Sequence, residues 1–77
     1  MYRNVVIGPR NAWVSVEDQL PPKDPAVYGE FSVSVLIINV DNEMEVGWCD
    51  LINRRWYVNY DNTKNITHWM PLPEPPA

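Results

Sequence analysis

The residues best suited to hold a ligand or a partner are aromatic. Four tryptophans and the single histidine form the candidate aromatic cluster: Trp13, Trp48, Trp56, His68 and Trp69. Indole rings stack on bases and sugars and anchor protein interfaces, but they also fill the cores of small β domains. We expect Trp48 and Trp56 to lie in the core. For Trp13 and Trp69, which lie nearer the termini, core packing and an exposed role are both open.

No residue pattern points to catalysis. His68 is the only histidine and Cys49 the only cysteine, so a histidine-centred metal site lacks further soft ligands. Ser15 or Cys49 could pair with His68, but neither lies in a nucleophile-elbow pattern. A short chain also struggles to form a water-excluding cleft. We therefore expect no catalytic residue, metal or cofactor, and a place for His68 at the edge of the core.

A second candidate site is acidic. It comprises Asp41, Glu43, Glu45 and Asp50. These side chains are predicted to form a solvated hairpin face that could steer a basic partner. Acidic residues outnumber basic ones by 10 to 6, for a net charge of −4, and the cations are scattered apart from Arg54-Arg55. Binding to nucleic acid, which requires clustered cations, is therefore disfavoured.

Length and composition indicate one small folded domain. The chain has 77 residues, of which 45% are hydrophobic and 21% charged, as in ordinary globular proteins. A lone cysteine cannot form an internal disulfide, which favours a reducing compartment such as the cytoplasm. The longest apolar run, Val35 to Ile38, is far below the ~20 residues that span a bilayer, so no membrane contact is expected.

A first β-hairpin is predicted in the proline-free middle of the chain. Residues 32–40 and 43–48 are rich in β-branched or alternating residues and flank a two-residue turn at Asp41-Asn42. That turn sets the register, and directly opposed residues share one face of the sheet. The predicted pairs are Val35 with Trp48, Ile37 with Val46, and Asn39 with Met44.

A second hairpin is predicted to join residues 48–51 to residues 55–60. A two-residue turn at Asn53-Arg54 would place Trp56 on the face away from Trp48. A three-residue turn, 52–54, would gather the aromatic rings on the core side, with Asn53 in the left-handed conformation. We prefer the three-residue turn.

Shorter elements flank the two hairpins. Residues 12–16 predict a further strand, unless 16–20 form one helical turn. Residues 61–65 are expected to form a polar loop, and 66–70 a short strand. Residues 70–76 should be extended polyproline II packed on the domain itself, because alternate prolines fix φ and remove amide donors.

Two segments resemble a known family. Residues 13–21 (WVSVEDQLP) resemble its opening motif and residues 67–76 (THWMPLPEPP) its closing motif. The family is the phage and prophage family known as domain of unknown function 551, and the resemblance covers residues 12–76. It implies a small accessory protein inside a bacterial host cell, and it implies no activity, cofactor or substrate.

These observations predict a mainly β fold: a small antiparallel meander of four to five strands, as a curved sheet or barrel-like roll, with a polyproline tail. Residues 1–11 would be an arm or edge strand and residues 12–77 one domain, with the opening and closing motifs side by side. The expected function is a non-enzymatic phage accessory binding module that contacts an unidentified host or phage protein. The alternatives are nucleotide or sugar binding in a tryptophan-lined pocket that includes His68, or homo-oligomerisation without a separate ligand.

Overall fold

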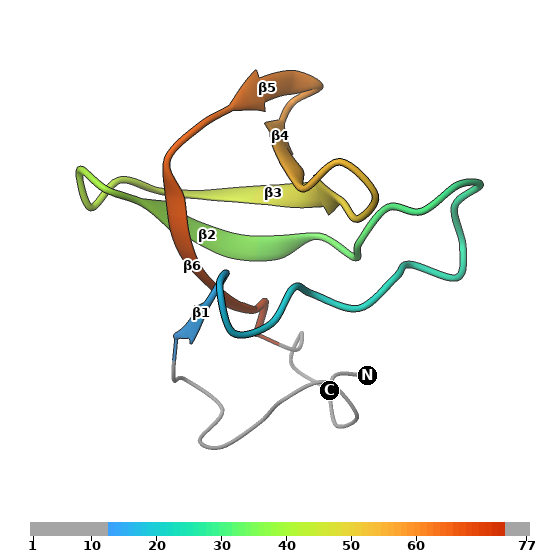
Figure 1. The fold of residues 1–77 in the computed structure, drawn as a ribbon, viewed down its shortest axis with the longest axis horizontal. Coiled ribbons are helices and arrows are strands. Elements are labelled where there is room, and N and C mark those ends of the chain that lie inside the picture. Colours follow the sequence, from blue (N-terminus) through green and yellow to red (C-terminus); the bar gives the residue numbers. More distant parts are fainter. Residues whose placement is uncertain (1–12, 74–77) are drawn as a thin grey trace.

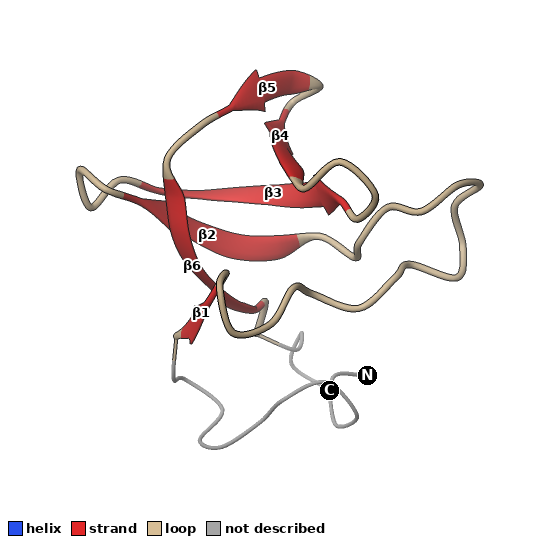
Figure 2. Cartoon of the chain, in the orientation of Figure 1, coloured by secondary structure: helices blue, strands red, loops and turns tan. Residues whose placement is uncertain are grey.

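Six short strands form one antiparallel sheet (Figure 1), and the computed structural model describes residues 13–73 of the chain. The strands are β1 (Val14–Ser15), β2 (Val35–Asn39), β3 (Met44–Asp50), β4 (Arg55–Val58), β5 (Asp61–Thr63) and β6 (Ile66–Pro71). Their order across the sheet is β1-β6-β2-β3-β4-β5. The described residues contain no helix (Figure 2). The mainly β prediction is confirmed, but the strands number six rather than four or five, and the sheet is not closed into a barrel.

Strand β6 brings the two ends of the described chain together. It lies between β1 and β2, so Trp69 pairs with Val14 on one side and with Ile37 on the other. Figure 1 shows β6, in red, crossing beside β2, in green. Beyond β1, the N–H of Val16 donates to the carbonyl oxygen of Thr67 at 3.0 Å. The predicted adjacency of the opening and closing motifs is confirmed.

The core lies on one face of the sheet. Its buried hydrophobic residues are Val35, Ile37, Cys49, Trp56 and Trp69. Val35 and Ile37 are two positions apart on β2. Because alternate side chains of a strand point to the same face, both enter the core. Leu20 and Val33, from the long connection between β1 and β2, pack against this group.

The connection between β1 and β2 is irregular, but hydrogen bonds and an isolated bridge attach it to the end of β3. Ser32, whose exposed fraction is 3%, donates its hydroxyl to the carbonyl of Val33 at 2.9 Å and accepts the N–H of Cys49 at 2.8 Å. Phe31 and Ser32 form isolated bridges with Asp50 and Lys23. The strand predicted from residue 32 therefore begins only at Val35, because the residues before it pair elsewhere.

The register of the first hairpin differs from the prediction by one residue. Val35 lies opposite Gly47 rather than Trp48, and Ile37 lies opposite Glu45. Because a one-residue shift exchanges the faces of a strand, Trp48 points away from the core. Gly47 and Cys49 take the inward positions of β3.

The Asn39 side chain accounts for this difference. Its Oδ1 accepts the N–H groups of Asp41 and Glu43 at 2.9 and 3.0 Å, and its Nδ2 donates to Glu43 Oε1 at 2.9 Å. Asn42 adopts a left-handed φ of 65°. The backbone bond from Asn39 N–H to Glu43 C=O closes a loop over residues 40–42, which replaces the predicted two-residue turn.

The second hairpin also differs from both predicted turns. Trp48 lies opposite Tyr57, and Cys49 lies opposite Trp56, so the two tryptophans face opposite sides of the sheet. Residues 51–54 form the loop, and its left-handed residue is Arg54, with φ of 57°, rather than Asn53.

The flanking elements follow the prediction in part. Residues 61–63 form β5 rather than a loop, and β6 extends the predicted strand to Pro71. The strand predicted over 12–16 is β1, and it ends in a turn in which Asp18 and Gln19 donate their N–H groups to Ser15 O. The predicted N-terminal arm and the last part of the predicted polyproline segment, residues 74–76, lie outside the described residues. Pro71, predicted in that segment, is instead the last residue of β6.

Candidate functional site

The fold separates the five residues of the candidate aromatic cluster. Trp56 and Trp69 lie in the core, with exposed fractions of 6% and 0%. The indole Nε1 of Trp69 donates to the carbonyl oxygen of Gln19 at 2.8 Å, which satisfies its polar atom. Trp48, expected in the core, is half-buried on the opposite face.

Trp13 and His68 line a separate hollow of about 400 Å³, together with residues of the β2–β3 hairpin. His68 Nδ1 lies 2.9 Å from Thr67 Oγ1, and that hydroxyl donates to the carbonyl oxygen of Ile38 at 3.3 Å. The Thr67 hydroxyl therefore lies between the His68 ring and the backbone of β2.

Trp48 belongs to an aromatic group on the outward face, together with Tyr57 and Tyr60. The ring centroids of Trp48 and Tyr57 lie 6.1 Å apart with planes 20° apart. The Trp48 and Tyr60 centroids lie 5.4 Å apart with planes at 71°, so Tyr60 meets Trp48 edge-on. We call Trp48, Tyr57 and Tyr60 the outer aromatic group.

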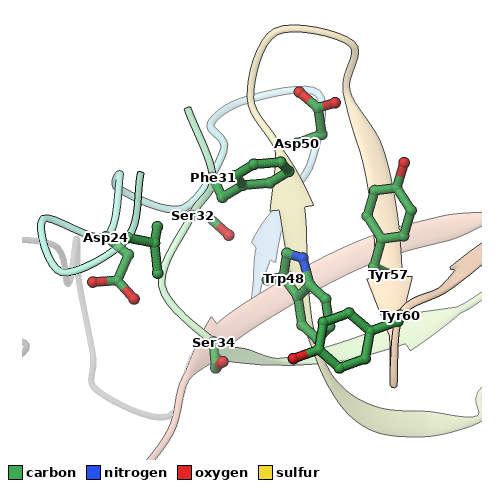
Figure 3. Close-up of a pocket in the computed structure, with 9 residues that line it drawn as sticks. Asp24, Phe31, Ser32, Ser34, Trp48, Asp50, Tyr57 and Tyr60 are labelled. Carbon is green, nitrogen blue, oxygen red and sulfur yellow. The ribbon is translucent and has the colours of Figure 1, made fainter. Parts of the chain in front are cut away.

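The outer aromatic group forms one wall of an open hollow of about 510 Å³ (Figure 3). The residues that line it are Asp24, Val27, Phe31, Ser32, Ser34, Trp48, Asp50, Tyr57 and Tyr60. Figure 3 shows the two tyrosines on one side and Asp24 on the loop opposite, with Trp48 between them. The volume lies within the range of small-molecule sites. The hollow thus offers aromatic rings, two carboxylates and two serine side chains.

The carboxylate of Asp50 is fixed at the rim of the hollow. The Asn53 side-chain amide donates to Asp50 Oδ2 at 2.9 Å, and the N–H groups of Asn53 and Ile52 donate to Oδ1 at 3.1 and 3.0 Å. The Asn53 amide, helped by these N–H groups, lowers the pKa of the Asp50 carboxyl below its usual value. Asp50 is therefore anionic at neutral pH.

A comparison with protein families assigns the chain. Residues 12–77 match a family model described as "Protein of unknown function (DUF551)". The chain belongs to the DUF551 family. The match confirms the family that the sequence was expected to belong to. No curated protein and no solved structure matches this DUF551 chain.

The four acidic candidates of the DUF551 chain lie at two places. Asp41, Glu43 and Glu45 are exposed near the β2–β3 turn. Asp50 lies at the other end of β3, in the hollow of the outer aromatic group. The fold therefore separates Asp50 from the other three, and only Asp50 lies beside aromatic rings.

The fold brings the adjacent pair Arg54-Arg55 together with Lys64, a cation that is nine residues further along the DUF551 sequence. Arg54, Arg55 and Lys64 line a hollow of about 410 Å³, to which Glu17 and the edge of Trp56 also contribute. The charged residues of the described chain that line the hollow of the outer aromatic group are both acidic, Asp24 and Asp50. The two hollows are thus opposite in charge.

Sequence patterns did not identify Tyr57, Tyr60 or Phe31 as site residues. A signal was present in Asn59, because asparagine tolerates the positive φ that a two-residue hairpin turn requires. In the structure φ is 51° at Asn59 and 68° at Tyr60. Among residues 13–73, no three His, Cys, Asp or Glu side chains are arranged to hold a metal ion. In the same range, no helix has the length and apolar character to cross a membrane.

Proposed function

We propose that this chain is a non-enzymatic binding module that contacts another protein through the outer aromatic group and its hollow. The opening and closing motifs resemble those of phage and prophage accessory proteins, which supports a partner from the phage or its bacterial host. The site of action would then be the host cytoplasm.

The observation that carries this proposal is the placement of Tyr60. It occupies the second position of the Asn59-Tyr60 turn at φ of 68°, where glycine is preferred and a bulky residue is strained. Its side chain is 88% exposed, so the ring adds little to the core. Strained residues concentrate at binding and catalytic sites, because function retains them against a cost of about 1–3 kcal/mol.

The surface around the outer aromatic group also suits a protein partner. Met44 and Val46 precede Trp48 on the same face of β3 and are 59% and 51% exposed. Tyrosine, tryptophan and methionine are enriched in protein interfaces relative to other surfaces. An interface there would cover a continuous apolar strip that ends in the hollow.

A small neutral ligand is the second candidate. The volume of about 510 Å³ and the stacked rings favour it. A sugar would stack on Trp48 or Tyr60. A nucleotide is a weaker candidate, because its phosphates would meet Asp24 and Asp50. The pocket expected to include His68 is a different one, since His68 lies in the hollow of Trp13.

In the test, three tagged forms of the full chain are used to capture proteins from a lysate of phage-infected cells. Wild type and Tyr60→Ala are compared with Tyr28→Ala, which removes a tyrosine that is fully exposed outside the hollow. We expect wild type and Tyr28→Ala to retain one specific protein, and Tyr60→Ala to retain about tenfold less or lower still. Circular dichroism establishes that each variant is folded. Equal retention by all three, or no specific protein with wild type, would overturn the proposal.

A further inference from the structure

We infer that the group bound in the hollow of the outer aromatic group is an arginine side chain of the partner protein. The inference rests on the proposed function and names the chemistry of its contact.

The rings provide a corner that fits a planar cation. Trp48 and Tyr60 stand at 71° with centroids 5.4 Å apart, and Tyr57 lies nearly parallel to Trp48. A guanidinium in this corner would lie over the face of one of these two rings and against the edge of the other. Aromatic faces attract cations within about 6 Å of the ring centroid, and arginine stacks on them more often than lysine.

Two carboxylates supply the charge. Among residues 13–73, Asp24 and Asp50 are the only charged residues that line the hollow, and they come from opposite walls. Asp24 Oδ1 accepts the N–H of Ala26 at 2.9 Å, which leaves acceptor positions on both oxygens of that carboxylate. A guanidinium donates in a fork that matches a carboxylate.

The nearest basic residues of the chain do not fill this place. Lys23 Nζ donates to the backbone carbonyl oxygen of Asp24 at 3.2 Å. Arg55 lies opposite Asp50 in the β3–β4 pair, but it lines the other hollow. Neither side chain contributes to the lining beside Trp48. The hollow therefore presents negative charge to an incoming group.

Other ligand classes use these groups less fully. A phosphate would be repelled by both carboxylates. A neutral sugar would stack on the rings but would leave the charge of the Asp24 carboxylate without a cationic partner in the hollow. An arginine side chain uses the rings through its guanidinium plane and the Asp24 carboxylate through its N–H donors, while the charge of Asp50 adds attraction at the rim.

The test is a titration of the ¹⁵N-labelled full chain with blocked pentapeptides. One peptide has a central arginine, the second has lysine and the third has citrulline, which keeps the shape of arginine without its charge. The indole N–H resonance of Trp48 reports on binding, and the buried Trp69 serves as the internal reference. Asp24→Asn is compared with Asp41→Asn, which removes an exposed carboxylate outside the hollow.

We expect the arginine peptide to shift the Trp48 resonance saturably, lysine to bind more weakly, and citrulline to bind about tenfold more weakly than arginine. Asp24→Asn should weaken arginine binding about fivefold or more, and Asp41→Asn by less than about twofold. Equal binding of arginine and citrulline would overturn the inference. So would tighter binding of a neutral sugar, or an unmoved Trp48 resonance with every peptide.

The titration and the capture experiment fail separately. If the peptides leave Trp48 unmoved while Tyr60→Ala still loses the captured protein, the arginine inference is wrong and the binding module stands. If Tyr60→Ala retains the captured protein fully, the proposed function itself is wrong. If lysine binds more tightly than arginine, the specific assignment to arginine is wrong.

Discussion

The indole Nε1 of Trp69 donates a hydrogen bond of 2.8 Å to the carbonyl oxygen of Gln19, and this bond joins the closing motif to the opening motif. The same residue has no exposed surface, and its backbone pairs with Val14 and Ile37. Trp69 therefore connects three segments that are distant in sequence. Trp69 thus has a structural role in the core, whereas Trp48 faces outward.

Trp69→Phe should destabilise the domain by about 2–4 kcal/mol, because it creates a cavity and leaves the Gln19 carbonyl without its donor. Trp48→Phe is the matched control, and it should cost about 1 kcal/mol or less, since its ring is half-buried. Urea unfolding followed by circular dichroism gives both values. Equal losses would contradict the assignment of Trp69 to the core.

Ser32→Ala should cost about 1–3 kcal/mol. The substitution removes the hydroxyl that accepts the Cys49 N–H at 2.8 Å, so a buried donor loses its partner. Ser34→Ala, at an exposed position two residues later, should change the free energy of unfolding by less than about 0.5 kcal/mol. The same urea experiment compares them. Indistinguishable variants would show that the Ser32 hydroxyl does not hold the loop onto β3.

Gly47→Ala should be among the most damaging small substitutions in the chain. A Cβ at Gly47 would lie 2.5 Å from the backbone oxygen of Tyr57 and 2.9 Å from Ile37 Cδ1. Because the Tyr57 oxygen belongs to the neighbouring strand, relief requires β3 and β4 to move apart. We expect a loss of about 2 kcal/mol or more, against about 1 kcal/mol for the neighbouring Val46→Ala. Thermal unfolding of both variants tests this order, and the reverse order would contradict the observed β3–β4 register.

Cys49 should make stability depend on alkaline pH. Burial, with Asp50 adding to it, raises the pKa of its thiol from 9.0 to about 11. The folded state therefore holds the thiol proton more tightly than the unfolded state. The resulting stabilisation is complete below pH 9 and is lost as pH rises toward 11.

The measurement compares wild type with Cys49→Ala, in which the other titrating groups are unchanged. Between about pH 8 and about pH 10.5, the free energy of unfolding of wild type should fall by roughly 2 kcal/mol relative to that of Cys49→Ala. A difference that stays constant over this range would mean that the thiol is not buried in the folded state.

The sequence was sufficient to predict the β class, the adjacency of the two motifs and the strand that begins at Ile66. It did not predict the registers, because the Asn39 and Asp50 side chains accept hydrogen bonds from the loop backbone and so determine the loops, and each loop shifts its strand pairing. A shift of one residue turned Trp48 outward. The hollow was not predictable from periodicity either, because one wall comes from irregular residues 24–34.

The most direct test of the binding proposal is Tyr60→Gly, measured for stability and for partner capture together. Glycine removes the strain at φ of 68°, which raises the free energy of unfolding, and it also removes the edge contact with Trp48, which lowers it. We predict a free energy of unfolding within about 1 kcal/mol of wild type, together with a loss of captured partner of about tenfold or more. A variant that is as stable as wild type and captures the partner equally well would contradict the assignment of the outer aromatic group to partner binding.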